Sequence, residues 1–297
     1  MALTPIRITC LRHSAFYSPL LYTIRSGLCE AEGLSPSYAP STPEKPFMQQ
    51  LQTGEAHLTQ AAVAVSFAEL EKGVRKTDLV HFAQINDRDG FFLARRGRDN
   101  SSFSLKDLEG KTVLVDHLFQ PLAMLKYACH KHGVNYEAIR VEDAGQPDAM
   151  ESAFREGRGD FVHLQGPVPQ QLEHDGLATT VASIGQAVGP VQFSSLCAKR
   201  SWLESDMAKT FMRAYQKGRK DTADLPAREV ASVVQPFFPE IESDVLVATV
   251  AAYQAMGCWG GEVAIPQSSY ETLVDIFLHC GIITRRHPYT AAIQNVV

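Results

Sequence analysis

The chain has 297 residues and a formal net charge of −5, and hydrophobic residues make up 45% of it. This length allows one large or two ordinary domains with a sizeable core. The acidic balance argues against a nucleic-acid partner. No run of 18 apolar residues occurs, so we expect no membrane span. The densest basic run, Arg95-Arg96-Gly97-Arg98, is followed by turn formers and predicts a solvated turn.

The N-terminus and the cysteines indicate a compartment. Residues 1–11 include Pro5 and Arg7 and contain no long apolar stretch, so they predict a strand and not a secretory signal. We therefore expect a cytoplasmic location for the sequence as written, and a periplasmic one if a leader was removed. The six cysteines lie far apart, which predicts free, mostly buried thiols. They are Cys10, Cys29, Cys129, Cys197, Cys258 and Cys280.

Strand-like and helix-like segments alternate along most of the chain. Strands are predicted at 6–11, 37–39, 57–60, 79–86, 91–94, 112–115, 138–141, 160–163, 178–184 and 192–198. Helices are predicted at 18–31, 46–53, 64–71, 121–130, 147–155 and 167–174, and residues 201–281 predict three or four more. Ser104 and Asp107 form a predicted helix-capping pair, and Pro121 suits a first helical position.

This alternation predicts parallel βαβ units and an α/β fold. Ligands in such folds lie beyond the carboxyl ends of the strands. The segments to inspect are therefore the loops 12–18, 59–63, 86–90, 116–121 and 164–167.

Several short motifs follow one another along most of the chain. They are AFYSPL at 15–20, GL at 27–28, EGL at 32–34, QQLQTGEAH at 49–57, SLKDLEGKTV at 104–113, AFREGRGDF at 153–161 and AKTFMRAY at 208–215. In this order the chain resembles the type II periplasmic-binding-protein fold. The resemblance is to the branch that includes the yeast thiamine-pyrimidine synthases and the NMT1/THI5-like substrate-binding proteins of ABC transporters.

The resemblance implies two α/β lobes with two chain crossings and a ligand in the interlobe cleft. Lobe one would comprise 1–88 and 191–297, and lobe two 89–190. The crossings would fall near 84–91 and 189–193. Short hinges of this kind permit closure around a small ligand.

The resemblance also implies a function. The leading hypothesis is a binding protein that closes on a small polar or heteroaromatic ligand without a cofactor, with a permease as partner if it serves a transporter. The alternative is a cytoplasmic, cofactor-independent enzyme on the same fold that uses a cleft His or Cys. The yeast synthases carry a CCCFC run that is absent from residues 189–197, so their iron-dependent chemistry does not carry over.

The first predicted strand-to-helix loop supplies candidate ligand contacts from lobe one. His13, Ser14, Phe16 and Tyr17 lie where this fold places its ligand. The alternative is that the two aromatic rings only cover the sheet. Ser14 also suits a helix N-cap.

Two further groups of candidates come from the third strand and the first crossing. Thr59 and Gln60 end the third predicted strand, where a buried amide needs hydrogen-bond partners. Asn86 lies at the crossing. One of the alternating side chains of Phe91 and Phe92 must face away from the core; we take Phe92 as the candidate for stacking on a flat ligand.

Lobe two supplies the opposite wall. Gln120 precedes a predicted helix, and Gln165 and Gly166 end a strand. His117 is the first candidate for acid–base chemistry if the protein is an enzyme, because histidine titrates near neutral pH.

Metal and thiol chemistry have weaker support in the sequence. His13, His57, His117 and His163 could converge, but their spacing does not require it, so we expect no metal. Cys197 and Cys258 are candidate nucleophiles, but a reactive cysteine needs a cationic partner, and none lies directly beside either of them in the sequence.

Overall fold

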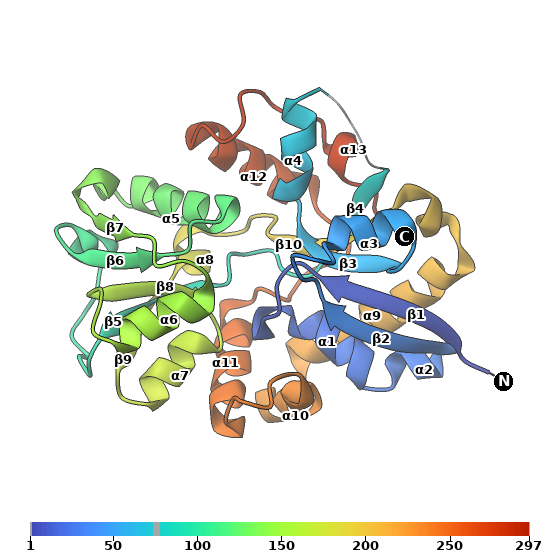
Figure 1. Cartoon of the computed structure of the whole chain (residues 1–297), viewed down its shortest axis with the longest axis horizontal. Coiled ribbons are helices and arrows are strands. Elements are labelled where there is room, and N and C mark those ends of the chain that lie inside the picture. Colours follow the sequence, from blue (N-terminus) through green and yellow to red (C-terminus); the bar gives the residue numbers. More distant parts are fainter. Residues whose placement is uncertain (1, 74–77, 297) are drawn as a thin grey trace.

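A computed structural model describes residues 2–73 and 78–296 and contains two five-stranded sheets in two lobes (Figure 1). The lobe-one sheet has the order β2-β1-β3-β10-β4, and the lobe-two sheet has the order β7-β6-β8-β5-β9. The lobe-one strands are β1 (Thr4–Cys10), β2 (Leu34–Pro40), β3 (Leu58–Ala62), β4 (Leu79–Gln84) and β10 (Ser194–Lys199). The lobe-two strands are β5 (Phe91–Arg96), β6 (Thr112–Val115), β7 (Arg140–Glu142), β8 (Phe161–Gln165) and β9 (Ala178–Ser183).

Helices surround each sheet. Those of lobe one are α1 (Ser18–Arg25), α2 (Leu28–Ala31), α3 (Phe47–Thr53), α4 (Ala64–Glu71), α9 (Asp206–Asp224), α10 (Ala227–Val234) and α13 (Tyr289–Ala292). Those of lobe two are α5 (Phe119–Lys131), α6 (Pro147–Arg155), α7 (Val168–His174) and α8 (Ile184–Val188). Two helices of the C-terminal segment also reach lobe two: α11 (Ser243–Met256) contacts α7, and α12 (Gln267–His279) contacts α5.

The predicted α/β, two-lobed fold with two chain crossings is confirmed, but the sheets are mixed. β1 pairs in parallel with β2 and β3, and β6 pairs in parallel with β7 and β8. β10 and β5 are antiparallel to both of their neighbours. Each of these two strands follows a crossing, so it enters its sheet from the other lobe. The prediction from alternation alone, of parallel pairs throughout, is therefore wrong for these strands.

The two crossings lie side by side. Val191 N–H donates to Asp87 O at 2.7 Å, and Ile85 N–H donates to Ser194 O at 2.9 Å. Ser194 N–H also donates to Asn86 Oδ1 at 3.1 Å. The division into moving lobes of 1–88 with 191–297, and 89–190, stays a prediction.

Most predicted elements are present, and the differences have local causes. The helix predicted over 18–31 is two helices, because Gly27 adopts a left-handed φ of +85° between them. α5 begins at Phe119, so Pro121 is its third residue and not its first. The strand predicted at 138–141 is β7, which begins at Arg140 after a short 3-10 turn.

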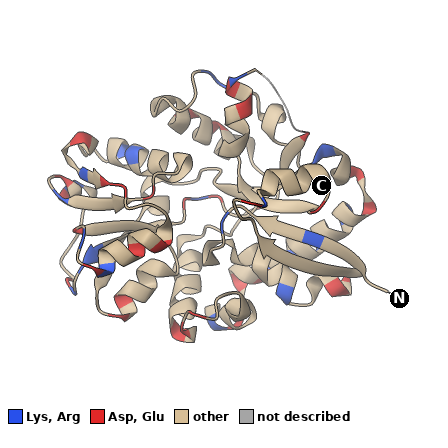
Figure 2. Cartoon of the chain, in the orientation of Figure 1, with Lys and Arg blue, Asp and Glu red and all other residues tan. Residues whose placement is uncertain are grey.

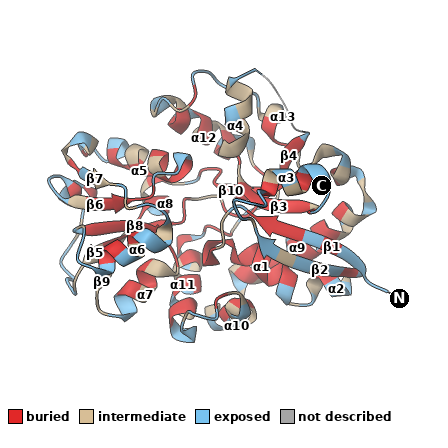
Figure 3. Ribbon diagram, viewed as in Figure 1, coloured by how far each residue is buried: buried red, intermediate tan, exposed pale blue. Residues whose placement is uncertain are grey.

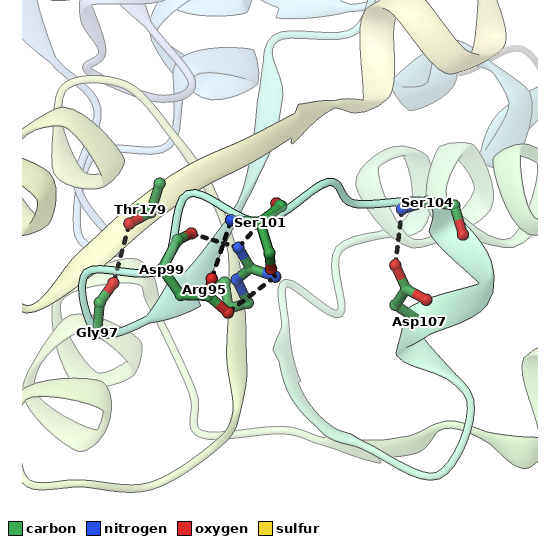
Figure 4. Close-up of polar contacts among 7 residues, drawn as sticks. All are labelled: Arg95, Gly97, Asp99, Ser101, Ser104, Asp107 and Thr179. Atoms are coloured by element: carbon green, nitrogen blue, oxygen red, sulfur yellow. Dashed lines mark hydrogen bonds and ion pairs between the residues drawn. The ribbon is translucent and has the colours of Figure 1, made fainter.

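Side-chain contacts organise the basic run Arg95–Arg98, which begins in the last two residues of β5 (Figure 4). Arg95 bonds to Ser101 Oγ at 3.1 Å and pairs with Asp99 at 3.2 Å. Arg96 lies over the Phe154 ring at 4.0 Å, which is a packed position and not the predicted solvated one. Ser104 N–H donates to Asp107 Oδ2 at 2.8 Å, so the predicted capping pair is present.

Charge is mixed over the molecule, and burial is greatest in the central strands. Acidic and basic residues are interspersed over both lobes (Figure 2), and the inner strands of each sheet and the inward faces of the helices carry the buried residues, whereas β2 is largely exposed (Figure 3). All six cysteines are free, and only Cys280 is not fully buried. Among the described residues, no helix is both long and apolar enough to cross a membrane.

Close packing of α1 on α9 depends on a glycine. A Cβ built on Gly218 would lie 2.0 Å from Thr23 Oγ1 and 3.1 Å from Thr23 Cα. Gly218→Ala should therefore lower the free energy of unfolding by about 1–3 kcal/mol, because the backbones must separate. A Cβ on Gly260 meets nothing closer than 3.4 Å, so Gly260→Ala is the matched control. Urea melts of both variants measure the difference, and equal stability of the two would contradict this account.

Candidate functional site

A cavity of ≈ 350 Å³ lies between the two lobes, at the carboxyl ends of β1, β3 and β8. Both lobes line it, together with the second crossing. Its polar lining residues are Arg12, Tyr17, Gln60, Gln120, Gln165 and Ser194. Its apolar lining residues are Leu11, Ala62, Ala64, Val65, Ala68, Phe91, Leu118, Phe119, Pro121 and Phe193.

The lobe-one wall of the cavity is held by hydrogen bonds. Gln60 Nε2 donates to Ser194 Oγ at 3.2 Å, and Arg12 N–H donates to Gln60 Oε1 at 3.3 Å. Burial raises the pKa of Tyr17, while the Arg12 charge and the Ser194 and Gln165 side chains oppose the rise. The Tyr17 hydroxyl is therefore a neutral group that can both donate and accept.

Two amide oxygens on the cavity wall have no donor among the described residues. Gln120 Nε2 donates to Gln192 O at 3.0 Å, which fixes the orientation of this amide and leaves its Oε1 buried without a partner. Gln165 Oε1 is also buried without a partner. A buried acceptor left unpaired costs about 1–3 kcal/mol. Both residues also line the cavity, so each oxygen is buried close to that space.

An ion pair joins the lobes beside the cavity. Arg12 follows β1 in lobe one, and its Nη1 lies 2.7 Å from Asp116 Oδ2, which follows β6 in lobe two. Asp116 Oδ1 accepts from Leu118 N–H at 2.9 Å. Both charged side chains are largely shielded from water, at 17% and 4% exposure, so the attraction is little screened.

Stacked rings form the back of the site. The Arg12 guanidinium lies 5.8 Å from the centroid of Phe91, and Phe91 stacks on His163 at 4.6 Å. His163 is fully buried, and within residues 2–73 and 78–296 neither of its ring nitrogens has a hydrogen-bond partner. Burial lowers the pKa of His163 to about 3, so the ring is neutral at physiological pH.

A second cavity, of ≈ 420 Å³, lies on the other side of Arg12 and Gln165, which line both spaces. His13, Ser14 and Gly166 also line it. Ser14 Oγ donates to Gly166 O at 2.9 Å, which makes a second bond between the lobes.

The structure divides the predicted site residues into three sets. Tyr17, Gln60, Gln120 and Gln165 line the first cavity. His13, Ser14 and Gly166 line the second, again with Gln165.

The third set lines neither of these two cavities. Phe16 is fully buried, and Thr59 Oγ1 bonds within its own strand. Asn86 Nδ2 donates to Phe16 O at 3.0 Å. Phe92 packs on Tyr253, with ring centroids 5.4 Å apart, so the cavity-lining member of the pair is Phe91. His117 Nδ1 contacts Val115 O at 2.7 Å.

The sequence does not single out several of the lining residues. Arg12 belongs to one of the predicted ligand loops, in which the adjacent His13 is the predicted contact. Leu118 and Phe119 precede Pro121, where the sequence predicts the helix to begin. Phe193 lies in the predicted second crossing, but its local sequence does not mark a cavity wall.

The described residues give little support to a thiol or metal mechanism. Burial raises the pKa of Cys197 to about 12 and that of Cys258 well above its usual value, so both thiols are protonated. The described residues contain no group of three or more His, Cys, Asp or Glu side chains placed to hold a metal ion.

A buried carboxyl lies in the first crossing. Asp89 Oδ1 accepts from Phe91 N–H at 2.6 Å, whereas its Oδ2 is buried without a partner. Burial raises the pKa of Asp89 to about 8, and the nearby Asp116 charge adds to the rise.

The two-lobed fold with a cavity between the lobes is that of the type II periplasmic binding proteins, a class of ligand-binding proteins, as predicted. Residues 16–229 match the model of the family described as NMT1/THI5 like. The chain belongs to that family.

Individual relatives are distant but similar over their whole length. YtlA of Bacillus subtilis, provisionally described as a binding protein, is 24% identical over 99% of this chain and 89% of its own. The ligand-binding component of an ABC-type import system from Staphylococcus aureus, solved with zinc bound, has a TM-score of 0.77 at 15% identity, covering 98% and 97% of the two chains. The periplasmic aliphatic sulphonate binding protein SsuA of Escherichia coli has a TM-score of 0.70 at 14% identity, covering 96% and 95%.

The buried carboxyl predicts a pH-dependent stability. Between the usual Asp pKa near 3.9 and the raised value of about 8, the folded state binds the proton more tightly than the unfolded state, so stability falls as pH rises. Asp89→Asn keeps an acceptor for Phe91 N–H and removes the ionisation. Its free energy of unfolding relative to the native protein should rise by roughly 2–4 kcal/mol from pH 5 to pH 8.5.

Urea melts at several pH values measure this difference. The exposed Asp206→Asn, whose ion-pair partner is Lys209, serves as the control and should show no such trend. A difference between Asp89→Asn and the native protein that is constant with pH would contradict the prediction.

Proposed function

We propose that the first cavity binds a flat, uncharged heteroaromatic molecule that carries both N–H donors and ring or carbonyl acceptors. The two unpartnered amide oxygens of Gln120 and Gln165 carry this proposal. They need donors, while Tyr17 and the remaining N–H groups of Arg12 can serve acceptors. Phe91 and Phe193 supply aromatic walls for a flat ring.

The same contacts argue against a small inorganic or sulfonate anion. Such an ion offers acceptors only, so it would leave both amide oxygens unpaired at a cost of about 1–3 kcal/mol each. The cation on the cavity wall is already paired, since Arg12 lies 2.7 Å from Asp116. The described ligand of the E. coli neighbour therefore does not transfer to this chain on the chemistry of the cavity.

We further propose that the protein delivers its ligand to a transporter permease. The support is the family match and the fold shared with a component of an ABC-type import system. This role places the protein on the outer side of the cytoplasmic membrane, in contrast to the cytoplasmic expectation drawn from the N-terminus and the thiols. Fractionation of the source cells distinguishes the two locations.

Isothermal titration tests the ligand class. We expect 4-aminopyrimidine, cytosine or adenine to bind, and ethanesulfonate and nitrate not to bind. Gln120→Leu should weaken binding by about tenfold or more, because the ligand N–H loses its acceptor. Gln171→Leu changes an amide on α7 that lines neither of the two cavities and is the matched control.

Two outcomes would overturn the proposal. One is tight binding of an anion together with no binding of any heteroaromatic compound. The other is equal binding by Gln120→Leu and the control, with both variants shown by thermal melting to be folded.

A further inference from the structure

The apolar side chains that the fold leaves in water gather at one place. The described residues include four large hydrophobic side chains that are exposed: Leu3, Leu11, Leu118 and Phe119, at 42%, 39%, 43% and 73%. Three of them, Leu11, Leu118 and Phe119, line the first cavity, and we call these three the apolar rim. Scattered exposed hydrophobic residues are ordinary, but a cluster at a cavity marks a place that something apolar covers.

Both lobes contribute to the apolar rim, and one carboxylate links the contributions. Leu11 precedes Arg12 in lobe one, and Asp116 in lobe two pairs with Arg12 through Oδ2. The other oxygen of Asp116 accepts from Leu118 N–H at 2.9 Å, beside Phe119. The ion pair that joins the lobes therefore also fixes the two halves of the rim.

Apolar side chains line the rest of the cavity beside the rim. Ala64, Val65 and Ala68 of α4 line the same space, as does Pro121 of α5. Of the polar lining residues, Gln60 lies within β3, Gln165 ends β8, Ser194 begins β10 and Gln120 lies in the first turn of α5. The volume of ≈ 350 Å³ lies within the range of about 300–1,000 Å³ for cavities that hold drug-sized ligands.

We propose that the natural ligand is amphipathic: a heteroaromatic head with an apolar substituent that covers Leu11, Leu118 and Phe119. This rests on the proposed function for the head and adds the chemical class of the remainder. Phe119 and Leu118 then determine specificity for the substituent, and the Arg12–Asp116 pair positions them. A ligand without the substituent leaves the rim in water and binds more weakly.

A homologous series tests the proposal. 4-Aminopyrimidine and its ring-substituted methyl, propyl and hexyl derivatives are titrated into the native protein. Each added methylene that reaches the rim should tighten binding by up to about fourfold. Phe119→Ala and Leu118→Ala should reduce the affinity for the hexyl derivative by about fivefold or more and leave that for unsubstituted 4-aminopyrimidine unchanged. Leu3→Ala, at an equally exposed leucine that lines neither interlobe cavity, is the control.

The outcomes separate this proposal from the proposed function. Straight-chain alcohols from propanol to octanol add methylene groups in the same steps but have no heteroaromatic head. If the protein does not recognise the head, the gain in affinity per methylene at the rim can therefore still be measured with the alcohols. Affinities that do not change with chain length in either series overturn the proposal. So do increments that survive in the Leu118→Ala, Phe119→Ala double variant. If Phe119→Ala and Leu118→Ala keep the native affinities but no longer support ligand uptake in cells, the proposal is wrong and the rim binds a protein partner instead.

Discussion

The hydrogen bonds between the two crossings are the constraint on which the rest of the structure depends. Because Ile85 and Asn86 pair with Ser194, and Asp87 pairs with Val191, the two connections form one short ribbon between the lobes. Loops that follow strands of both sheets then open onto the same space. The cavity lies between the lobes because the two hydrogen-bonded crossings hold these loops next to each other.

Contacts between loops of the two lobes set the chemistry inside that space. The Arg12–Asp116 pair and the Ser14–Gly166 bond hold the walls together without any ligand. The Arg12–Asp116 pair also neutralises the positive charge that the described residues bring to the wall of the first cavity, so recognition falls to amides and a hydroxyl. Tyr253 on α11 adds a bond to each of two segments, accepting from Gly166 N–H at 2.8 Å and donating to Gly90 O at 3.1 Å.

The sequence predicts the elements well where local rules decide them and less well where distant contacts do. Pro147 and Ser104 mark helix starts that the structure retains. The direction of β5 and β10 depends on strands that are distant in sequence, so alternation of elements could not reveal it. The same limit applies to the site. The loops were predictable, but Arg12 gained its importance from a partner 104 residues away.

The position of β10 has a consequence for synthesis. β10 lies between β3 and β4, yet it comes after the whole of the lobe-two sheet in the chain. When β1 to β4 have emerged from the ribosome, β4 still lacks β10, its neighbour in the described sheet, whereas the lobe-two strands of that description lie within residues 91–183. Chains fold largely in the order in which their domains emerge. The lobe-two sheet is therefore the first that can form completely. The lobe-one sheet can be completed only after β10 has been synthesised.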